Sequence, residues 1–165
     1  MKTPICDLCL KTGLLCPGCQ KRLSEGTLSK LDVDVAQMLY KINDTHNISE
    51  ASFVRALDLG RVVLIITEGD VGILIGRGGS VVGQISSALG KKVRIVEYSG
   101  DIRKSITDII MPARLLGINT VWKAGREIFK VRISRSDAFA LPVDSGSLEG
   151  VIKSWTGKEV AIAFE

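Results

Sequence analysis

The chain has 165 residues, and its hydrophobic fraction of 45% is enough for the packed core of one ordinary domain or of two small ones. Aromatic residues make up only 5% and the formal net charge is +4, so base recognition mainly by stacking is disfavoured and a polyanionic partner is allowed but not required. No apolar run is long enough to span a membrane and no secretory signal pattern opens the chain, so we expect a cytoplasmic protein without a membrane partner.

All four cysteines fall near the start of the chain, at Cys6, Cys9, Cys16 and Cys19. Each pair has the two-residue spacing that lets both thiolates of a knuckle bind one ion, and two pairs supply the four ligands of a closed tetrahedral site. Such a site has no open position for water or substrate, so the pattern predicts one structural Zn²⁺ in a segment comprising residues 1–27. Two disulfides or free thiols are the alternatives.

The next elements are expected to be one helix and two strands. Apolar residues at helical spacing predict an amphipathic helix over Leu28–Asn43. His46 follows in a polar stretch typical of a turn, where an exposed loop histidine is expected and a fifth metal ligand is the alternative. Residues 52–59 alternate in polarity, and the β-branched run at 62–67 is typical of a buried strand.

A glycine-rich loop between two helices is predicted after these strands. Asp70 can cap a short helix over residues 71–75, which must break at Gly76. A second amphipathic helix is expected over residues 80–89. Residues 91–98 then alternate charged with apolar side chains, which predicts a half-solvated strand.

The same order of elements recurs in the last third of the chain. A helix is expected over Ile102–Leu116, with strands at Thr120–Lys123 and Glu127–Ser134. So many identities without a gap predict two copies of one unit. The gapless alignment that carries Gly79 onto Gly146 also pairs Asp70 with Asp137, Ser80 with Ser147, Gly83 with Gly150, Gly90 with Gly157 and Lys91 with Lys158.

This order of elements resembles the type II KH domain. The loop Gly76-Arg77-Gly78-Gly79, preceded by Ile73-Leu74-Ile75, closely matches the Gly-x-x-Gly loop of that family. Two such units, joined by a stretch like Met111–Asn119, are similar to archaeal NusA-like proteins. The resemblance implies an α+β fold of two tandem type II KH domains (α-β-β-α-α-β) at residues 28–99 and 100–165, behind the four-cysteine segment.

The resemblance also implies a function. A KH domain clamps about four nucleotides of single-stranded RNA by their backbone, and NusA-like proteins act in transcription elongation and termination on RNA emerging from RNA polymerase. The alternative is a ribosome-associated protein or ribosome assembly factor that binds ribosomal RNA, since a four-cysteine segment and a KH unit are common ingredients there. We expect no enzyme and no small-molecule substrate, because the single histidine has no catalytic grouping and no Walker-type lysine follows the glycine loop.

Elementary electrostatics supports an anion at this loop. A helix that restarts at Gly79 or Ser80 leaves its first N–H groups without intrahelical partners and carries partial positive charge at that end. The glycines at 76, 78 and 79 let a sugar-phosphate chain approach the backbone, and Arg77 can add a charge-assisted contact. A tight turn without a ligand is the alternative.

Residues beside the loop are candidates for contact with the bases. Ile73, Ile75 and Val82 can form an apolar floor, while Lys92 and Arg94 on the following strand can meet the bases or the flanking backbone. Each assignment has a structural alternative. Helical spacing also fits the three apolar residues to the core, and alternating charges are typical of a solvated strand face.

The second unit departs from the loop pattern. At the aligned positions it has Val143-Asp144-Ser145-Gly146, so the first glycine is lost and a carboxylate stands where a phosphate would bind. We therefore predict that the second unit is structural or protein-binding, and that it extends the RNA path at most through another face. Phe139 and Trp155 are expected in its core, whereas the place of Trp122 is left open.

Overall fold

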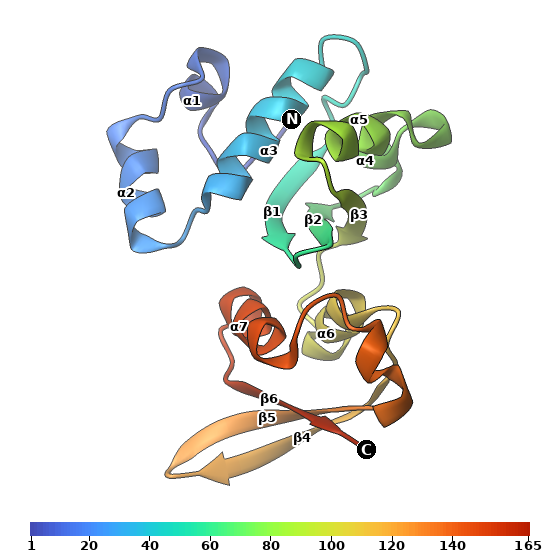
Figure 1. Ribbon diagram of the computed structural model, residues 1–165. Helices are drawn as coiled ribbons and strands as arrows, with labels where there is room; N and C mark the ends of the chain where they lie inside the picture. The colour runs from blue at the N-terminus through green and yellow to red at the C-terminus, as the bar shows by residue number, and fades with distance from the viewer. The chain divides into compact units, whose positions relative to one another are not determined.

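The computed structural model describes all 165 residues, which divide into two compact units. Unit 1 comprises Met1–Asp58 and Val62–Tyr98, and unit 2 comprises Leu59–Arg61 and Ser99–Glu165. Each unit combines helices with one three-stranded sheet, so the chain is a mixed α+β protein (Figure 1). None of the helices combines the length and the apolar character needed to cross a membrane.

Unit 1 has the predicted order of elements after its cysteine segment. Its sheet has the order β1-β2-β3, with β1 antiparallel and β3 parallel to β2. Each element predicted between Leu28 and Tyr98 is confirmed to within two residues at either end. The elements are α1 (Asp7–Thr12), α2 (Pro17–Glu25), α3 (Lys30–Ile42), β1 (Ser52–Asp58), β2 (Val62–Glu68), α4 (Gly72–Ile75), the 3-10 turn η1 (Arg77–Gly79), α5 (Ser80–Leu89) and β3 (Lys92–Glu97).

Helix α3 is fixed to the sheet by a buried carboxylate. The Ser29 hydroxyl accepts the N–H of Asp32, and the Asp32 carboxylate accepts the N–H of Ser29, which together form a capping box. The same carboxylate accepts the N–H of Ala56 in β1 at 2.7 Å. Since Asp32 is only 1% exposed, these bonds satisfy a charge that would otherwise be costly to bury.

The cysteine segment is built into unit 1. Ile5 and Leu10 are buried in the same hydrophobic core as Val35 and Leu39 of α3. Lys2 extends this attachment, because its N–H donates to the carbonyl of Ala51 and its carbonyl accepts the N–H of Phe53. The segment therefore shares its core with the helices and strands that follow it.

Unit 2 repeats the topology of unit 1. Its sheet has the order β4-β5-β6, with β4 antiparallel and β6 parallel to β5. Its two α-helices lie on one face of this sheet, and the other face carries no helix of the unit (Figure 1). The elements are α6 (Ile102–Ile110), β4 (Leu115–Lys123), β5 (Arg126–Ile133), the 3-10 segment η2 (Arg135–Ala140), α7 (Ser145–Thr156) and β6 (Val160–Phe164).

The predicted boundary between α6 and β4 was wrong. The helix ends at Ile110 instead of Leu116, and the strand begins at Leu115 instead of Thr120. Pro112 explains the early end, because proline lacks an N–H and disfavours a helical conformation in the residue before it.

The expectation that Phe139 packs in the core of unit 2 was also wrong. Phe139 is 98% exposed on η2, the segment that stands where unit 1 has α4. Trp155 is half-buried, and Trp122 is 69% exposed near the end of β4. The core is filled instead by the aliphatic side chains of Ile106, Ile109, Ile110, Val131, Ile133, Leu148 and Ile152.

Candidate metal and nucleic-acid sites

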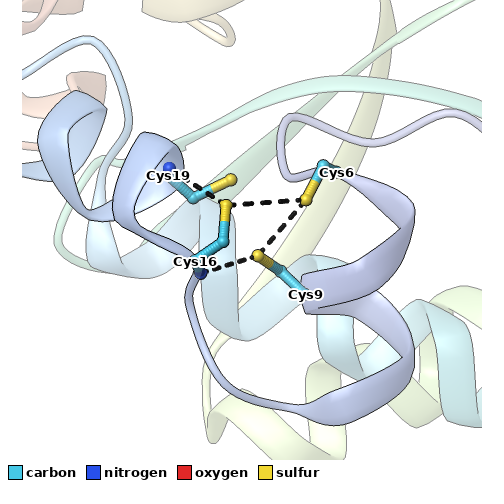
Figure 2. A group of neighbouring side chains, drawn as sticks. All are labelled: Cys6, Cys9, Cys16 and Cys19. Atoms are coloured by element: carbon cyan, nitrogen blue, oxygen red, sulfur yellow. Dashed lines mark hydrogen bonds between the residues drawn. The ribbon is translucent and has the colours of Figure 1, made fainter.

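The four cysteines form one cluster. Their Sγ atoms all lie within 4.8 Å of one another (Figure 2). The Sγ of Cys6 is 3.3 Å from that of Cys9 and 3.8 Å from that of Cys16. A tetrahedral ion with Zn–S bonds of about 2.3 Å holds its sulfurs about 3.8 Å apart. All four thiols are free, so the arrangement is compatible with one metal ion and not with two formed disulfides.

Each cysteine pair begins a helix. Cys6 is the N-cap of α1 and Cys16 is the N-cap of α2, so Cys9 and Cys19 lie in the first turns. The N–H of Cys16 donates to the Sγ of Cys9 at 3.0 Å, and the N–H of Cys19 donates to the Sγ of Cys16 at 3.5 Å. Backbone N–H groups at helix starts favour negative charge. The backbone therefore stabilises thiolates in this cluster.

Without a metal, the thiols hold their protons unequally. Hydrogen bonds, first that from the N–H of Cys19, lower the pKa of Cys16 to about 6. At Cys9, the N–H of Cys16 lowers the pKa, but burial and the neighbouring thiols outweigh it and raise the pKa to about 12. Four thiolates this close would repel one another. A cation is thus needed before all four can lose their protons together.

Helices α1 and α2 were not predicted from the sequence, which had been interpreted as two knuckles. Signals for them were present. Pro17 occupies the first position of α2, where proline is favoured. Gly13 and Gly26 end the two helices in the left-handed conformation, with φ of 75° and 82°.

His46 lies in the loop between α3 and β1 and is outside the cysteine group. Its Nδ1 is 2.9 Å from the hydroxyl oxygen of Thr45 and 3.5 Å from the side-chain nitrogen of Gln84. The loop position predicted for His46 is confirmed, but its side chain is half-buried and not exposed as expected.

The glycine loop joins α4 to α5 through η1. Gly76, Gly78 and Gly79 have φ of 78°, 62° and 78°, in the region that favours glycine. A Cβ at Gly76 would lie 2.7 Å from the Ser80 hydroxyl and from two atoms of Val81, so this position excludes any side chain. A Cβ at Gly78 would meet nothing within 4 Å. The loop is therefore closed on one side and open to approach at Gly78.

The N-terminus of α5 carries no cap from the protein. Its N-cap residue is Gly79, no side chain accepts from its first turn, and that turn contains no acidic residue. The N–H groups of Gly79 and Ser80 donate to the carbonyls of Gly76 and Arg77, so only the first-turn N–H groups beyond Ser80 are left for water or a ligand. Arg77 is exposed beside them and forms no ion pair, so its guanidinium is free to contact an anion.

In unit 2 the corresponding helix end is already filled. Helix α7 begins at Ser145, which aligns with Gly78, and its N-cap is Asp144. The Asp144 carboxylate accepts the N–H of Ser147 at 2.9 Å and its hydroxyl at 2.8 Å. The chain's own carboxylate thus occupies the position that an external anion would need.

Asp144 makes the stability of the protein depend on pH. The N–H and the hydroxyl of Ser147 lower the pKa of Asp144, which is about 3.9 in an unfolded chain. Stability from a lowered pKa is present above the unfolded value and is lost as pH falls through the folded one. We expect Asp144→Asn to lower Tm at neutral pH, and the difference from wild type to shrink below about pH 4. Thermal unfolding by circular dichroism would measure it; a difference independent of pH would contradict this origin.

The apolar neighbours of the loop differ in exposure. Ile75, at the end of α4, is 36% exposed and lies directly before Gly76. Ile73 packs against the core of unit 1, which matches its structural alternative, and Val82 is half-buried on α5. Of the three predicted floor residues, Ile75 is therefore the most accessible beside the loop.

Lys92 and Arg94 are not brought to the loop. Val93 and Ile95, which alternate with them on β3, pack against the core that contains α4 and α5. Alternation therefore directs Lys92 and Arg94 to the opposite face of the sheet. Lys92 is exposed there and Arg94 is half-buried.

Part of the chain matches a known protein family. Residues 30–98 match the family described as NusA-like first KH domain. This part of the chain is therefore similar to a KH domain of the NusA-like type. The matched residues include α3, the sheet of unit 1 and the glycine loop.

Several similar proteins are named probable transcription termination protein NusA. That of Methanocaldococcus jannaschii is 44% identical over 70 residues, covering 41% of this chain and 37% of that protein. That of Methanococcus vannielii is 38% identical over 55 residues, covering 33% and 32%. The chain thus spans about a third of the length of these two relatives. That of Halobacterium salinarum is 28% identical over 130 residues, covering 78% and 87%.

A solved structure extends the likeness beyond the KH match. The crystal structure of APE1850 superposes with a TM-score of 0.53 at 26% identity. The superposition covers 76% of this chain and 96% of that chain. The similarity in fold therefore includes more of the molecule than residues 30–98.

Proposed function

We propose that this chain is a non-enzymatic, NusA-like transcription factor that clamps the backbone of single-stranded RNA at the loop Gly76–Gly79. The observation that carries the proposal is the N-terminus of α5, which lacks a side-chain cap and lies in the residues that match a NusA-like KH domain. KH domains bind about four nucleotides through such a loop. The filled helix end at Asp144 provides an internal contrast.

The contacts can be assigned from the loop outward. The N–H groups of Gly79 and Ser80 donate within the loop, so a phosphate would accept hydrogen bonds from N–H groups of α5 beyond Ser80. The Arg77 guanidinium would add charge-assisted bonds. The bare backbone at Gly78 leaves room for the sugar. Ile75 would contact the base that follows, while Lys92 and Arg94, on the other face of the sheet, would meet only flanking backbone.

We further propose that the cysteine cluster holds one structural Zn²⁺. A donor set of four sulfurs selects soft or borderline ions, and a closed tetrahedral shell is typical of structural zinc. The ion would join the starts of α1 and α2. Since Cys9 and Cys19 are buried in the core of unit 1, this link would also stabilise the KH domain.

Unit 2 is proposed to be a degenerate second KH domain. The identical sheet order of the two units supports this, as does the gapless alignment of their glycines. The proposed organisation is a cysteine segment at residues 1–27, a KH domain with an intact loop at 28–99 and a degenerate copy at 100–165.

A second candidate is a ribosome-associated protein or ribosome assembly factor. Two features favour it: the cysteine cluster shares a core with unit 1, and the second loop is closed by Asp144. Both suit a fixed docking role on folded RNA and neighbouring proteins.

Crosslinking of the chain to RNA in its native cell, followed by sequencing, would test the proposal. We expect reads spread over nascent and messenger transcripts, and we expect the Arg77→Asp, Gly78→Asp double variant to lose them. Reads concentrated at one position of ribosomal RNA would instead support the second candidate. Equal reads from the double variant would contradict a role for the loop in either case.

A further inference from the structure

The sheet of unit 2 has one face that no helix of the unit covers. Val131 and Ile133 of β5 are fully buried, so odd-numbered positions of β5 face α6 and α7 (Figure 1). Alternation then directs the even-numbered positions of β5 to the opposite face. The register of the sheet identifies their neighbours on β4 and β6.

We call this surface the basic face. It has four cations, and its positions on β4 and β5 include no carboxylate. Its remaining side chains are small or apolar. The basic face consists of Gly117, Asn119, Val121 and Lys123 on β4, Arg126, Ile128, Lys130 and Arg132 on β5, and Ala161 and Ala163 on β6.

The cations are held along the hairpin of β4 and β5. Lys123 is directly opposite Arg126 in the register. The guanidinium of Arg132 lies against Gly117, where any Cβ would overlap it. Lys130 lies between the two arginines on β5, and alternate positions on a strand are about 6.7 Å apart. The sheet therefore presents the four cations as one strip.

Two of these cations retain unneutralised charge. Arg126 pairs with Glu159 at 3.2 Å and Arg132 pairs with Glu165 at 3.2 Å, both acids standing at the ends of β6. Lys123 and Lys130 form no ion pair. The charges of these two lysines are consequently not neutralised by ion pairs within the chain.

We propose that the basic face binds the sugar-phosphate backbone of RNA, independently of base sequence. Phosphate contacts come mainly from lysine and arginine. Lysine is depleted in protein–protein interfaces, which disfavours an acidic protein as the partner. The small side chains of Ala161 and Ala163 leave the β6 side of the strip accessible to a polymer. This inference rests on the proposed function for the nature of the ligand and adds a second contact region.

Charge-neutral substitution of the two unpaired lysines tests the proposal. The full chain carrying Lys123→Gln and Lys130→Gln would be titrated with polyuridylate oligomers, one of about four nucleotides and one several times longer. We expect the long RNA to bind roughly tenfold more weakly, and the slope of log affinity against log salt to fall by about 1.4, or about 0.7 per lost phosphate contact. Binding of the short RNA should be unchanged.

A matched control removes two lysines from the other side of unit 2. Lys104 lies on α6, on the helix-covered side of the sheet, and Lys158 follows α7. Their replacement by Gln changes net charge equally and should leave binding of both RNAs near that of wild type. An equal loss in both variants, or no loss at Lys123 and Lys130, would overturn the proposal. Failure of the loop alone would appear differently, as unchanged short-RNA binding in the Arg77→Asp, Gly78→Asp variant.

Discussion

Replacing Arg77 and Gly78 together by Asp is expected to weaken binding of a short single-stranded RNA by well over tenfold. The change removes a guanidinium from the open end of α5 and puts two carboxylates in its place. A hydrogen bond to a charged group contributes about 1.5–3 kcal/mol, and each tenfold in affinity is about 1.4 kcal/mol. Loss of the arginine contact alone should therefore weaken RNA binding about tenfold. Repulsion between phosphate and the new carboxylates should weaken it further. Fluorescence anisotropy of a labelled oligonucleotide would measure the effect.

The fold should tolerate this double substitution. Arg77 is exposed and forms no ion pair, so its loss breaks no contact within the protein. A Cβ at Gly78 meets nothing within 4 Å, and φ of 62° with ψ of 22° is a conformation that Asp accepts better than most residues. Gly76 would be a poor choice for such a test, because a side chain there overlaps the start of α5.

The second unit supplies a control for the added charge. Ser145 aligns with Gly78, so Gly78→Asp and Ser145→Asp each add one negative charge at equivalent places. Ser145 is the first residue of α7, where an acidic residue is favourable. We expect Gly78→Asp to weaken RNA binding and Ser145→Asp to change it little. A comparable loss in both would show that net charge, and not the loop of unit 1, governs affinity.

Periodicity was sufficient to predict the elements of unit 1 between Leu28 and Tyr98. The boundaries of these elements are marked by residues in the sequence, because Ser29 caps α3 and Gly90 ends α5. The glycine loop was equally visible, since its three positive φ angles require the residue type that the sequence displays. The alignment of glycines also predicted the order of elements in unit 2.

Periodicity could not predict which sheet face the helices cover. Strand β2 is buried on both faces from Val63 to Thr67, so its pattern does not distinguish one face from the other. Lys92 and Arg94 on the neighbouring β3 were therefore grouped with the loop, although Val93 and Ile95 occupy the side of the helices. The face that the helices cover depends on tertiary packing, and a local sequence pattern carries no information about it.

The same limit explains two other differences. The apolar repeat of α6 continues through Leu115 and Leu116, so hydrophobicity alone did not locate the end of the helix at Ile110. Phe139 was assigned to the core because aromatic side chains are usually buried there. Seven aliphatic residues fill that core instead.

Removal of the proposed Zn²⁺ is expected to unfold α1 and α2 and to lower the Tm of unit 1. Structural zinc contributes apparent free energies of about 10–16 kcal/mol in zinc-finger peptides, and here the protonated thiols would also have to share a cluster in which Cys9 is buried. The rest of the core, including Leu39, Ile65 and Ile85, does not depend on the ion, so β1–β3 should persist. Hydrogen exchange of the backbone amides before and after chelation would separate the two regions.

Elemental analysis of the native protein should find one zinc per chain, and Cys19→Ser should reproduce the exchange pattern of the chelated protein without any chelator. Ser24→Ala is a suitable control, because Ser24 is exposed on α2 and is not a ligand. Readdition of Zn²⁺ to the chelated wild type should restore protection and release protons, since the pKa of Cys9 is raised to about 12 in the metal-free cluster. A metal-free native sample with oxidised cysteines would contradict the assignment, because the four sulfurs would then be paired by covalent bonds and chelation would leave α1 and α2 intact.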